Sequence, residues 1–369
     1  MSLSLDPVHG RVARRFALGG TPIASRLISS GHIHVTVALT VETAAGPREY
    51  ILQCVNHHVF EQPLEVMANM HRVTRHIRAK LAAIPGADAE RGTLTIVPTL
   101  TGDDCEHIDG HWWRVFTMIT GARSYDVAED AEMAYEAALA FGRFQALLAD
   151  LPGEPLYDTI PNFHNAPKRL EAFLAKVQED PHGRAADCRE QIDFALEHQH
   201  LVHRLTGALE RGELPTRIVH NDTKINNVLL AEGTRKALCV IDLDTVMPGT
   251  VLYDFGDQVR STAGRFDEGT LDLASVKLDL ALFEGLVRGY LEAAGDMLTP
   301  AEIDGIAVAG QVITFTQGVR FLTDHLNGDG YFRIHHPGQN LERTRVQFTY
   351  VRDMIAKREA MEAIVARYR

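Results

Sequence analysis

The stretch His220-Asn221-Asp222-Thr223-Lys224-Ile225-Asn226-Asn227, followed by Val240-Ile241-Asp242-Leu243-Asp244, decides how this chain is interpreted. Reduced to its polar positions, the first block reads H-x-D-x-x-x-x-N. The second block is an apolar, strand-like run that places Asp242 twenty residues after Asp222. Two carboxylates and an amide at this spacing suit a reaction that needs positioning and charge neutralisation from the protein, and little covalent help.

Phosphoryl transfer from ATP to a hydroxyl group is the reaction that this order favours. In such sites one Asp orients and deprotonates the acceptor hydroxyl, and an Asn and a second Asp hold Mg²⁺ against the ATP phosphates. The order predicts Asp222 as the catalytic residue. It predicts Asn227 and Asp242 as Mg²⁺ ligands, because Mg²⁺ prefers hard oxygen donors. Asp244 is a second-metal ligand or a structural residue, and the sequence leaves both roles open.

Composition narrows the class of protein. A chain of 369 residues is too long for one compact core and suits two lobes. Acidic residues outnumber basic ones by 49 to 37, so we expect neither nucleic acid nor an anionic membrane as a partner. The four cysteines are scattered, which predicts neither a zinc site nor a disulfide framework. No run of eighteen apolar residues and no leader is found, and a cytoplasmic location is expected.

Periodicity predicts an α+β fold with two lobes. The N-terminal lobe, residues 1–118, is expected to hold an antiparallel sheet and one main helix at 64–82, where apolar residues recur every three or four positions. Its strands are expected at 32–40, 48–55, 92–100 and 112–119, with a turn at 44–47. The larger lobe, residues 119–369, is expected to be mostly helical, with helices at 129–151, 165–177, 186–210, 271–294, 300–326 and 340–367.

The motifs carry a family resemblance. The chain resembles the aminoglycoside-phosphotransferase/choline-kinase superfamily, whose members share a two-lobed, protein-kinase-like fold. Within it, the sequence is most similar to the N-acetylhexosamine 1-kinases, which phosphorylate the anomeric hydroxyl of N-acetylglucosamine or N-acetylgalactosamine. The blocks that carry this narrower resemblance are H-N-D-T-K-x-N-N from His220, I-D-L-D-T-x-M-P-G from Ile241, Arg320-Phe321-Leu322 and Tyr331-Phe332.

The resemblance implies ATP and Mg²⁺ as cofactors and a small-molecule sugar as the substrate. It implies that Lys224 neutralises the γ-phosphate, although a solvated loop lysine is the plainer alternative. His220 is expected to organise the catalytic loop, and Asp254 to brace it from the start of the next helix. Sugar contacts are implied for His32, His34, Arg320 and Tyr331, together with Asp222. For Arg320 the alternative is a helix-surface pair with Asp324, four residues on.

The nucleotide side departs from the common kinase pattern. The phosphate loop has one glycine, in Ser29-Ser30-Gly31-His32, and its backbone N–H groups are expected to meet phosphate oxygens. Gln53 stands where a strand lysine is usual, as in the hexosamine branch, and His34 stands where that branch carries Asn. Residues Thr117, Met118 and Ile119 are expected to meet adenine.

Two other functions remain open at this point. One is a kinase of the same superfamily for an aminoglycoside, choline, ethanolamine or homoserine. The other is a nucleotide-binding pseudokinase that regulates a partner. The oligomeric state, monomer or dimer, is also open.

Overall fold

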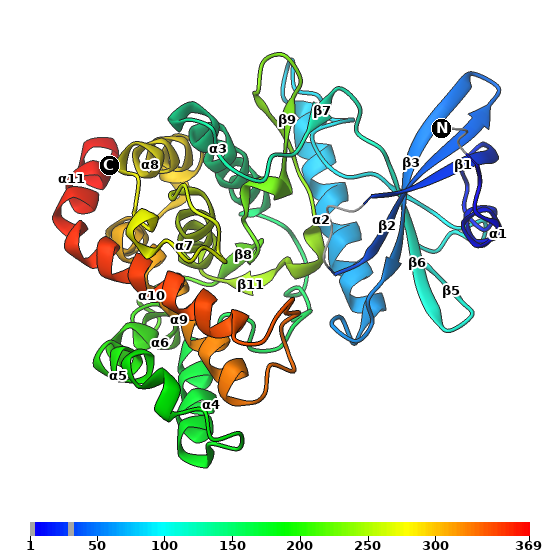
Figure 1. Cartoon of the computed structure of the whole chain (residues 1–369). Helices are drawn as coiled ribbons and strands as arrows, with labels where there is room; N and C mark the ends of the chain where they lie inside the picture. The colour runs from blue at the N-terminus through cyan, green and yellow to red at the C-terminus, as the bar shows by residue number, and fades with distance from the viewer. Residues whose placement is uncertain (1–3, 29–32) are drawn as a thin grey trace. The chain divides into compact units, whose positions relative to one another are not determined.

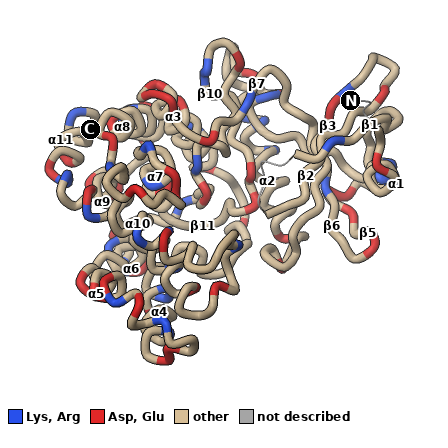
Figure 2. Tube along the Cα trace, viewed as in Figure 1, with Lys and Arg blue, Asp and Glu red and all other residues tan. Residues whose placement is uncertain are grey.

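The computed structural model describes residues 4–28 and 33–369 and divides into two compact units. Unit 1 consists of Met1–Arg123, Asp150–Pro161 and Leu238–Met247, and unit 2 of Ser124–Ala149, Asn162–Ala237 and Pro248–Arg369 (Figure 1). Basic and acidic residues are interspersed along both units (Figure 2). The predicted division at residues 118 and 119 follows chain order alone and stays a prediction.

Unit 1 is built on an antiparallel sheet. Its strands β1 (Gly20–Ile28), β2 (Val35–Thr43), β3 (Gly46–Val55), β6 (His111–Thr117) and β4 (Ile96–Val97) lie in that order, and β5 (Glu106–Ile108) also pairs with β6. Val37, Leu39 and Val41 alternate along β2 and are fully buried, as expected where every second residue faces a core. They pack in one cluster with residues of β3 and β6. The helices of this unit are α1 (Pro7–Ala13) and α2 (Pro63–Ala83), and the short strand β7 (Ala122–Arg123) ends its first stretch.

Unit 2 is mostly helical. Its helices are α3 (Ala131–Leu148), α4 (Ala166–Glu179), α5 (Arg189–Glu197), α6 (Thr206–Glu210), α7 (Val251–Thr262), α8 (Leu280–Ala294), α9 (Pro300–Leu326), α10 (Gln339–Ala356) and α11 (Arg358–Tyr368). The short strands β8 (Arg217–Val219) and β9 (Val228–Ala231) also belong to this unit, whereas the boundaries between the units fall within β10 (Ala237–Val240) and β11 (Met247–Gly249). The α+β class, with a sheet lobe and a helical part, is therefore confirmed.

Glycines allow α3 and α8 to approach closely within unit 2. A Cβ atom added to Gly285 or Gly289 of α8 would lie 2.3 and 2.2 Å from the carbonyl oxygens of Ala131 and Tyr135 on α3. A Cβ on Gly142 of α3 would lie 2.9 Å from the Cβ of Ala293. The backbones of the two helices are therefore in direct contact.

Several predicted elements were wrong in extent. The helix expected at 186–210 is interrupted by a 3-10 helix, η2 (Gln199–His203), in a stretch of weak helix formers where the His198 ring bonds the carbonyl of Phe194. The helix expected at 340–367 breaks at Lys357, whose ammonium group donates to Leu278 O. The helix expected from residue 271 starts only at Leu280, because the Asp279 side chain caps it there.

None of the described helices has the length and apolar character needed to cross a bilayer.

Candidate active site

The loop after β8 carries Asp222 and is fixed by the first two turns of α7. The backbone N–H groups of His220 and Asn221 donate to the Asp254 carboxylate at 2.8 and 2.6 Å. The Thr223 hydroxyl donates to the Asp254 carbonyl at 2.6 Å, and its N–H donates to Asp257 at 2.9 Å. Asn221 adopts a positive φ of 67°, which turns the chain between the strand and Asp222. The loop is thus held by backbone hydrogen bonds to two buried carboxylates.

His220 and Asp254 lie beneath this loop and away from solvent. The His220 ring is fully buried against the edges of Phe141 and Phe144, and its Nδ1 atom accepts from the N–H of Asp222 at 3.3 Å. Burial raises the pKa of Asp254 to about 6, against the effect of the His220 and Asn221 N–H groups.

Asp222 is the reachable carboxylate of the loop. Its side chain is 22% exposed, and its Oδ2 atom lies 3.1 Å from the Lys224 ammonium group. The Asn227 amide nitrogen donates to the Asp222 carbonyl at 2.8 Å and to its Oδ2 atom at 3.0 Å. Burial lowers the pKa of Lys224, but Asp222 and Asp257 outweigh burial and leave it above its ordinary value. Unit 2 therefore brings Asp222, Lys224 and Asn227 into one cluster.

A pocket of about 70 Å³ opens beside Asp222 within unit 2. Complete ligand sites usually measure about 300–1,000 Å³, so this pocket has room for part of a small molecule. Its lining residues are Phe163, His164, Asn221, Asp222, Asp257, Arg260, Ile313, Thr316, Gln317 and Arg320.

His164 and Arg260 give the pocket fixed polar groups. A carbonyl oxygen only accepts, so His164 donates from Nε2 to Asn221 O, at 2.9 Å. Burial lowers the pKa of His164 to about 4, so the ring is neutral at pH 7. Arg260 is bound to Asp257 at 2.8 Å and approaches Glu268 at 3.4 Å. Although burial lowers the pKa of Arg260, these carboxylates raise it above its usual range.

Arg320 lines the same pocket. Its guanidinium donates to Gln317 at 3.0 Å and lies 5.3 Å from the centre of the Phe332 ring and 5.9 Å from those of Phe163 and Tyr331. Burial and the positive charge of Arg169 lower the pKa of Arg320.

The alternative pairing of Arg320 with Asp324 is not what the structure has. Asp324 instead accepts from the N–H groups of Tyr331 and Phe332 and from the Asn340 amide, at 2.8 to 2.9 Å. Among the described residues no carboxylate forms an ion pair with Arg320. Tyr331 is 69% exposed, with its ring beside Arg320.

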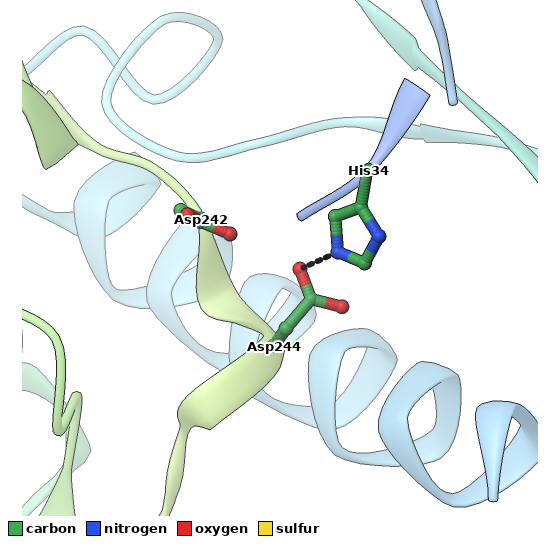
Figure 3. A group of neighbouring side chains, drawn as sticks. All are labelled: His34, Asp242 and Asp244. Atoms are coloured by element: carbon green, nitrogen blue, oxygen red, sulfur yellow. Dashed lines mark ion pairs between the residues drawn. The ribbon is translucent and has the colours of Figure 1, made fainter. Parts of the chain in front are cut away.

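Unit 1 holds the second acidic group. Asp242 and Asp244 flank Leu243, and with His34 they place one possible ligand atom each within 4.8 Å of one another (Figure 3). Asp244 is buried and paired with Arg114, whose two terminal nitrogens lie 2.5 and 2.7 Å from its two oxygens. Burial alone would raise the pKa of Asp244, but Arg114 and His34 hold it far below its usual value. Asp242 is exposed and has a positive φ of 62°.

Those residues predicted for the nucleotide that the structure describes lie in or beside the sheet of unit 1. Gln53 on β3 accepts from Arg114 at 3.0 Å and donates to Thr36 at 3.1 Å. Thr117 and Met118, at the end of β6, use their N–H groups on Thr95 O and Glu49 O, and Ile119 follows them. The predicted residues Ser29, Ser30, Gly31 and His32 lie outside the described residues.

Some residues at these sites were missed from the sequence. His164, Asp257, Arg260 and Arg114 were not predicted as site residues, and the fold brings each of them to its place. The only signal for Asp257 was its position in Asp254-Phe255-Gly256-Asp257, three residues after the predicted brace.

Comparison with known proteins decides the family. The profile of the phosphotransferase enzyme family matches residues 25–299, most of the chain. The chain belongs to the phosphotransferase enzyme family. It is a small-molecule phosphotransferase with this family's fold.

Several solved structures have a similar fold, and each matches this chain over nearly the whole length of both proteins. An aminoglycoside phosphotransferase from Alicyclobacillus acidocaldarius is 12% identical, with a TM-score of 0.55, over 100% of this chain and 97% of that one. A microcompartment-associated aminopropanol kinase is 16% identical, with a TM-score of 0.55, over 96% and 98%. An amicoumacin kinase in complex with AMP-PNP, Ca²⁺ and Ami is 11% identical, with a TM-score of 0.53, over 94% and 90%. At these identities the likeness establishes the fold.

Proposed function

We propose that this phosphotransferase is an ATP- and Mg²⁺-dependent kinase that converts an N-acetylhexosamine, N-acetylglucosamine or N-acetylgalactosamine, to its 1-phosphate. The long motif blocks from His220, Ile241, Arg320 and Tyr331 support the hexosamine branch. The family supports phosphoryl transfer as the reaction.

The observation that carries the choice of acceptor is the pocket that Asp222 shares with Arg260 and Arg320. Asp257 compensates the charge of Arg260, whereas no carboxylate pairs with Arg320 among the described residues, so a cationic acceptor such as choline or an aminoglycoside would meet the uncompensated guanidinium of Arg320. A neutral sugar offers hydroxyl oxygens, and its N-acetyl group adds a carbonyl oxygen, which a guanidinium donor binds well. Arg320 has no carboxylate partner among the described residues, so its remaining N–H donors favour such an acceptor.

Asp222 is proposed as the acceptor-side base. In the transfer, the oxygen of the anomeric hydroxyl forms a bond to the γ-phosphorus, the bond from that phosphorus to the β–γ bridging oxygen breaks, and the hydroxyl proton passes to the Asp222 carboxylate. An anomeric hydroxyl is more acidic than an ordinary alcohol, so the Asp222 carboxylate can accept its proton late in the reaction. Lys224, at 3.1 Å from Asp222, is proposed to neutralise charge on the transferred group.

The donor set fits Mg²⁺. Asn227 uses its amide nitrogen on Asp222, which leaves its Oδ1 atom as a ligand, and Asp242 offers an exposed carboxylate. Mg²⁺ would neutralise the charge that develops on the phosphate oxygens. Asp244 is less suited to ligation, because Arg114 occupies both of its oxygens. ATP is proposed to contact Gln53, Thr117 to Ile119, and the loop of Ser29, Ser30 and Gly31.

The test is ADP release measured with purified protein, ATP and Mg²⁺ across a panel of acceptors. The panel contains N-acetylglucosamine, N-acetylgalactosamine, glucose, galactose, choline, ethanolamine, homoserine and an aminoglycoside. We expect the highest kcat/KM with an N-acetylhexosamine, and a phosphorus NMR signal coupled to the anomeric proton of the product. A preference for choline or an aminoglycoside would refute the acceptor assignment, and nucleotide binding without turnover of any acceptor would favour a regulatory pseudokinase.

Asp222→Asn is the matched test of the base. The substitution preserves shape and removes proton affinity and negative charge, so kcat should fall by on the order of 10² or more while ATP affinity changes little. Near-normal kcat in this variant would remove Asp222 from the chemistry.

A further inference from the structure

A buried cation stands directly beside the position of the missing strand lysine. The register of the sheet pairs Gln53 on β3 with Arg114 on β6. Residues paired across neighbouring strands project from the same face of the sheet. Arg114 donates through Nε to the Gln53 side-chain oxygen, and Gln53 donates in turn to Thr36 on β2. Three strands therefore fix the stem and the first nitrogen of this arginine.

The rest of the guanidinium is committed to Asp244. Its two terminal nitrogens bind one carboxylate oxygen each, at 2.5 and 2.7 Å, in the fork geometry that arginine alone among the side chains provides. Arg114 is 1% exposed and Asp244 is equally buried. Removing two charges from water is costly, and replacing a buried ion pair with an apolar pair of similar volume is often neutral or stabilising. The stability of the fold does not by itself account for this buried ion pair.

His34 lies next to the same carboxylate. Its Nδ1 atom accepts from the N–H of Asn56 at 3.1 Å, so the neutral ring carries its proton on Nε2. That nitrogen faces an Asp244 oxygen at 3.4 Å (Figure 3). At this distance the ring lies beside the carboxylate, but Nε2 forms no hydrogen bond with it. Asp242 is the exposed member of this group of three residues.

The turn between the two aspartates is unusual. Asp242 is left-handed, with φ 62° and ψ 57°, and precedes the 3-10 helix η4 (Leu243–Thr245) that contains Asp244. Non-glycine residues adopt this conformation at a cost, and they keep it where the surroundings hold them. The fixed point two residues away is Asp244, held by Arg114.

We propose that Arg114 is a positioning residue for Asp242: by binding both oxygens of Asp244 it holds the left-handed turn that presents the Asp242 carboxylate to the nucleotide-bound metal. This inference rests on the metal role given to Asp242 in the proposed function. It assigns Asp244 to the support of the metal ligand.

The test is calorimetric binding of AMP-PNP with Mg²⁺ and, separately, in EDTA, together with the melting temperature. In the double variant Arg114→Met/Asp244→Leu an apolar pair replaces the ion pair, so the fold should survive. We expect its Mg²⁺-dependent nucleotide affinity to fall about 10- to 100-fold, as for other residues that orient a metal ligand, while its affinity in EDTA is unchanged. Wild-type Mg²⁺-dependent affinity in a folded double variant would overturn the proposal.

A single variant separates support from direct ligation. Arg114→Gln releases Asp244 without removing its charge. If Asp244 were itself a metal ligand, Mg²⁺-dependent affinity would stay or rise, and the proposal would be overturned; if Arg114 positions Asp242, this affinity falls. The matched control is Arg217→Gln, which breaks a fork-shaped pair with Glu302 (2.7 and 2.9 Å) in unit 2 and should leave the Mg²⁺-dependent affinity unchanged.

Two measurements on the wild-type protein, nucleotide binding and phosphoryl transfer, distinguish a failure of this inference from a failure of the proposed function. Metal-dependent nucleotide binding by the wild-type protein, without transfer to any hexosamine, removes only the acceptor assignment. Absence of metal-dependent binding in the wild-type protein overturns the metal role of Asp242 and this inference with it.

Discussion

Asn227 and Asp242 have different surroundings, and their variants should differ accordingly. Asp242 is an exposed carboxylate, so Asp242→Ala should abolish transfer and weaken Mg²⁺–nucleotide binding. Asn227 is buried and also binds the Asp222 side chain at 3.0 Å. Raised Mg²⁺ should therefore restore metal binding to Asn227→Ala but leave kcat below the wild-type value. Rates measured over a Mg²⁺ titration test this, and full recovery of kcat would show that the bond to Asp222 has no catalytic effect.

Arg320 gives the second expectation at the scale of a residue. A lost sugar contact leaves substrate oxygens without a donor, so Arg320→Ala should lower kcat/KM for the N-acetylhexosamine by an amount worth ~1–3 kcal/mol. The KM for ATP and the melting temperature should change little. Arg352→Ala is the control, since Arg352 also lies over an aromatic ring, Phe194, at 4.6 Å, but does not line the pocket. Equal effects of the two variants on the sugar kinetics would contradict the assignment.

His164 predicts a pH dependence of stability. Its pKa is lowered in the folded protein to about 4, from 6.5, mainly by burial. The neutral ring therefore stabilises the fold above pH 6.5, and this stability is lost as the pH falls from 6.5 towards 4, by on the order of 3 kcal/mol at most. Urea unfolding at several pH values should show a smaller loss in His164→Gln than in the wild-type protein. Asp254, whose raised pKa contributes in the opposite direction between pH 3.8 and about 6, is present in both and cancels in the difference.

Individual site residues could be predicted from the sequence where they belong to a short motif. Asp222, Lys224 and Asn227 were predicted from one block, and the structure brings them together. His164 and Arg260 line the same pocket but come from distant segments, so the spacing of residues in the sequence could not predict them. Arg114 was not predicted as a site residue, because its pairing depends on a partner 130 residues away in the chain.

At the scale of the element, the contact between α3 and α8 depends on glycine. An alanine at Gly289 would place its Cβ 2.2 Å from a carbonyl oxygen of α3, and a backbone atom cannot move aside as a flexible side chain can. We expect Gly289→Ala to lower the free energy of unfolding by ~1–3 kcal/mol. The control is Gly295→Ala, at the end of α8. An added Cβ would meet no neighbouring group within 4 Å there, and φ is −51°, so this substitution should leave the free energy of unfolding unchanged or raise it slightly. Similar unfolding curves for both variants would contradict the close contact.

Elements with strong local signals were predicted well. The helix at 300–326 was predicted with its correct ends, because Thr299 and Glu302 form a capping box in front of Pro300 and the apolar residues that follow. The hairpin of β2 and β3 follows from its alternating β-branched residues and its turn. Predictions were wrong where a distant contact ends an element, as Lys357 does by reaching Leu278 O. No local pattern encodes such a contact.

For the whole molecule, the α+β fold followed from the change of period along the chain. What order along the chain could not give is that unit 1 is completed by residues 150–161 and 238–247. Asn69 of α2 shows why these stretches belong there, since its amide donates to Tyr157 O and Val246 O at 2.8 and 3.1 Å. Those carbonyls have no signature in a sequence.

This discontinuity sets an order for events on the ribosome. Arg114 is synthesised 130 residues before Asp244, the carboxylate that compensates its buried charge. Until that aspartate emerges, the guanidinium of Arg114 has no carboxylate partner. Burying an unpaired charge is costly, so we expect the guanidinium to stay in water. Unit 1 is therefore translated first but cannot complete its folding until residue 244 has been synthesised. A fragment that ends near residue 118 should remain loosely packed around β6 even at equilibrium.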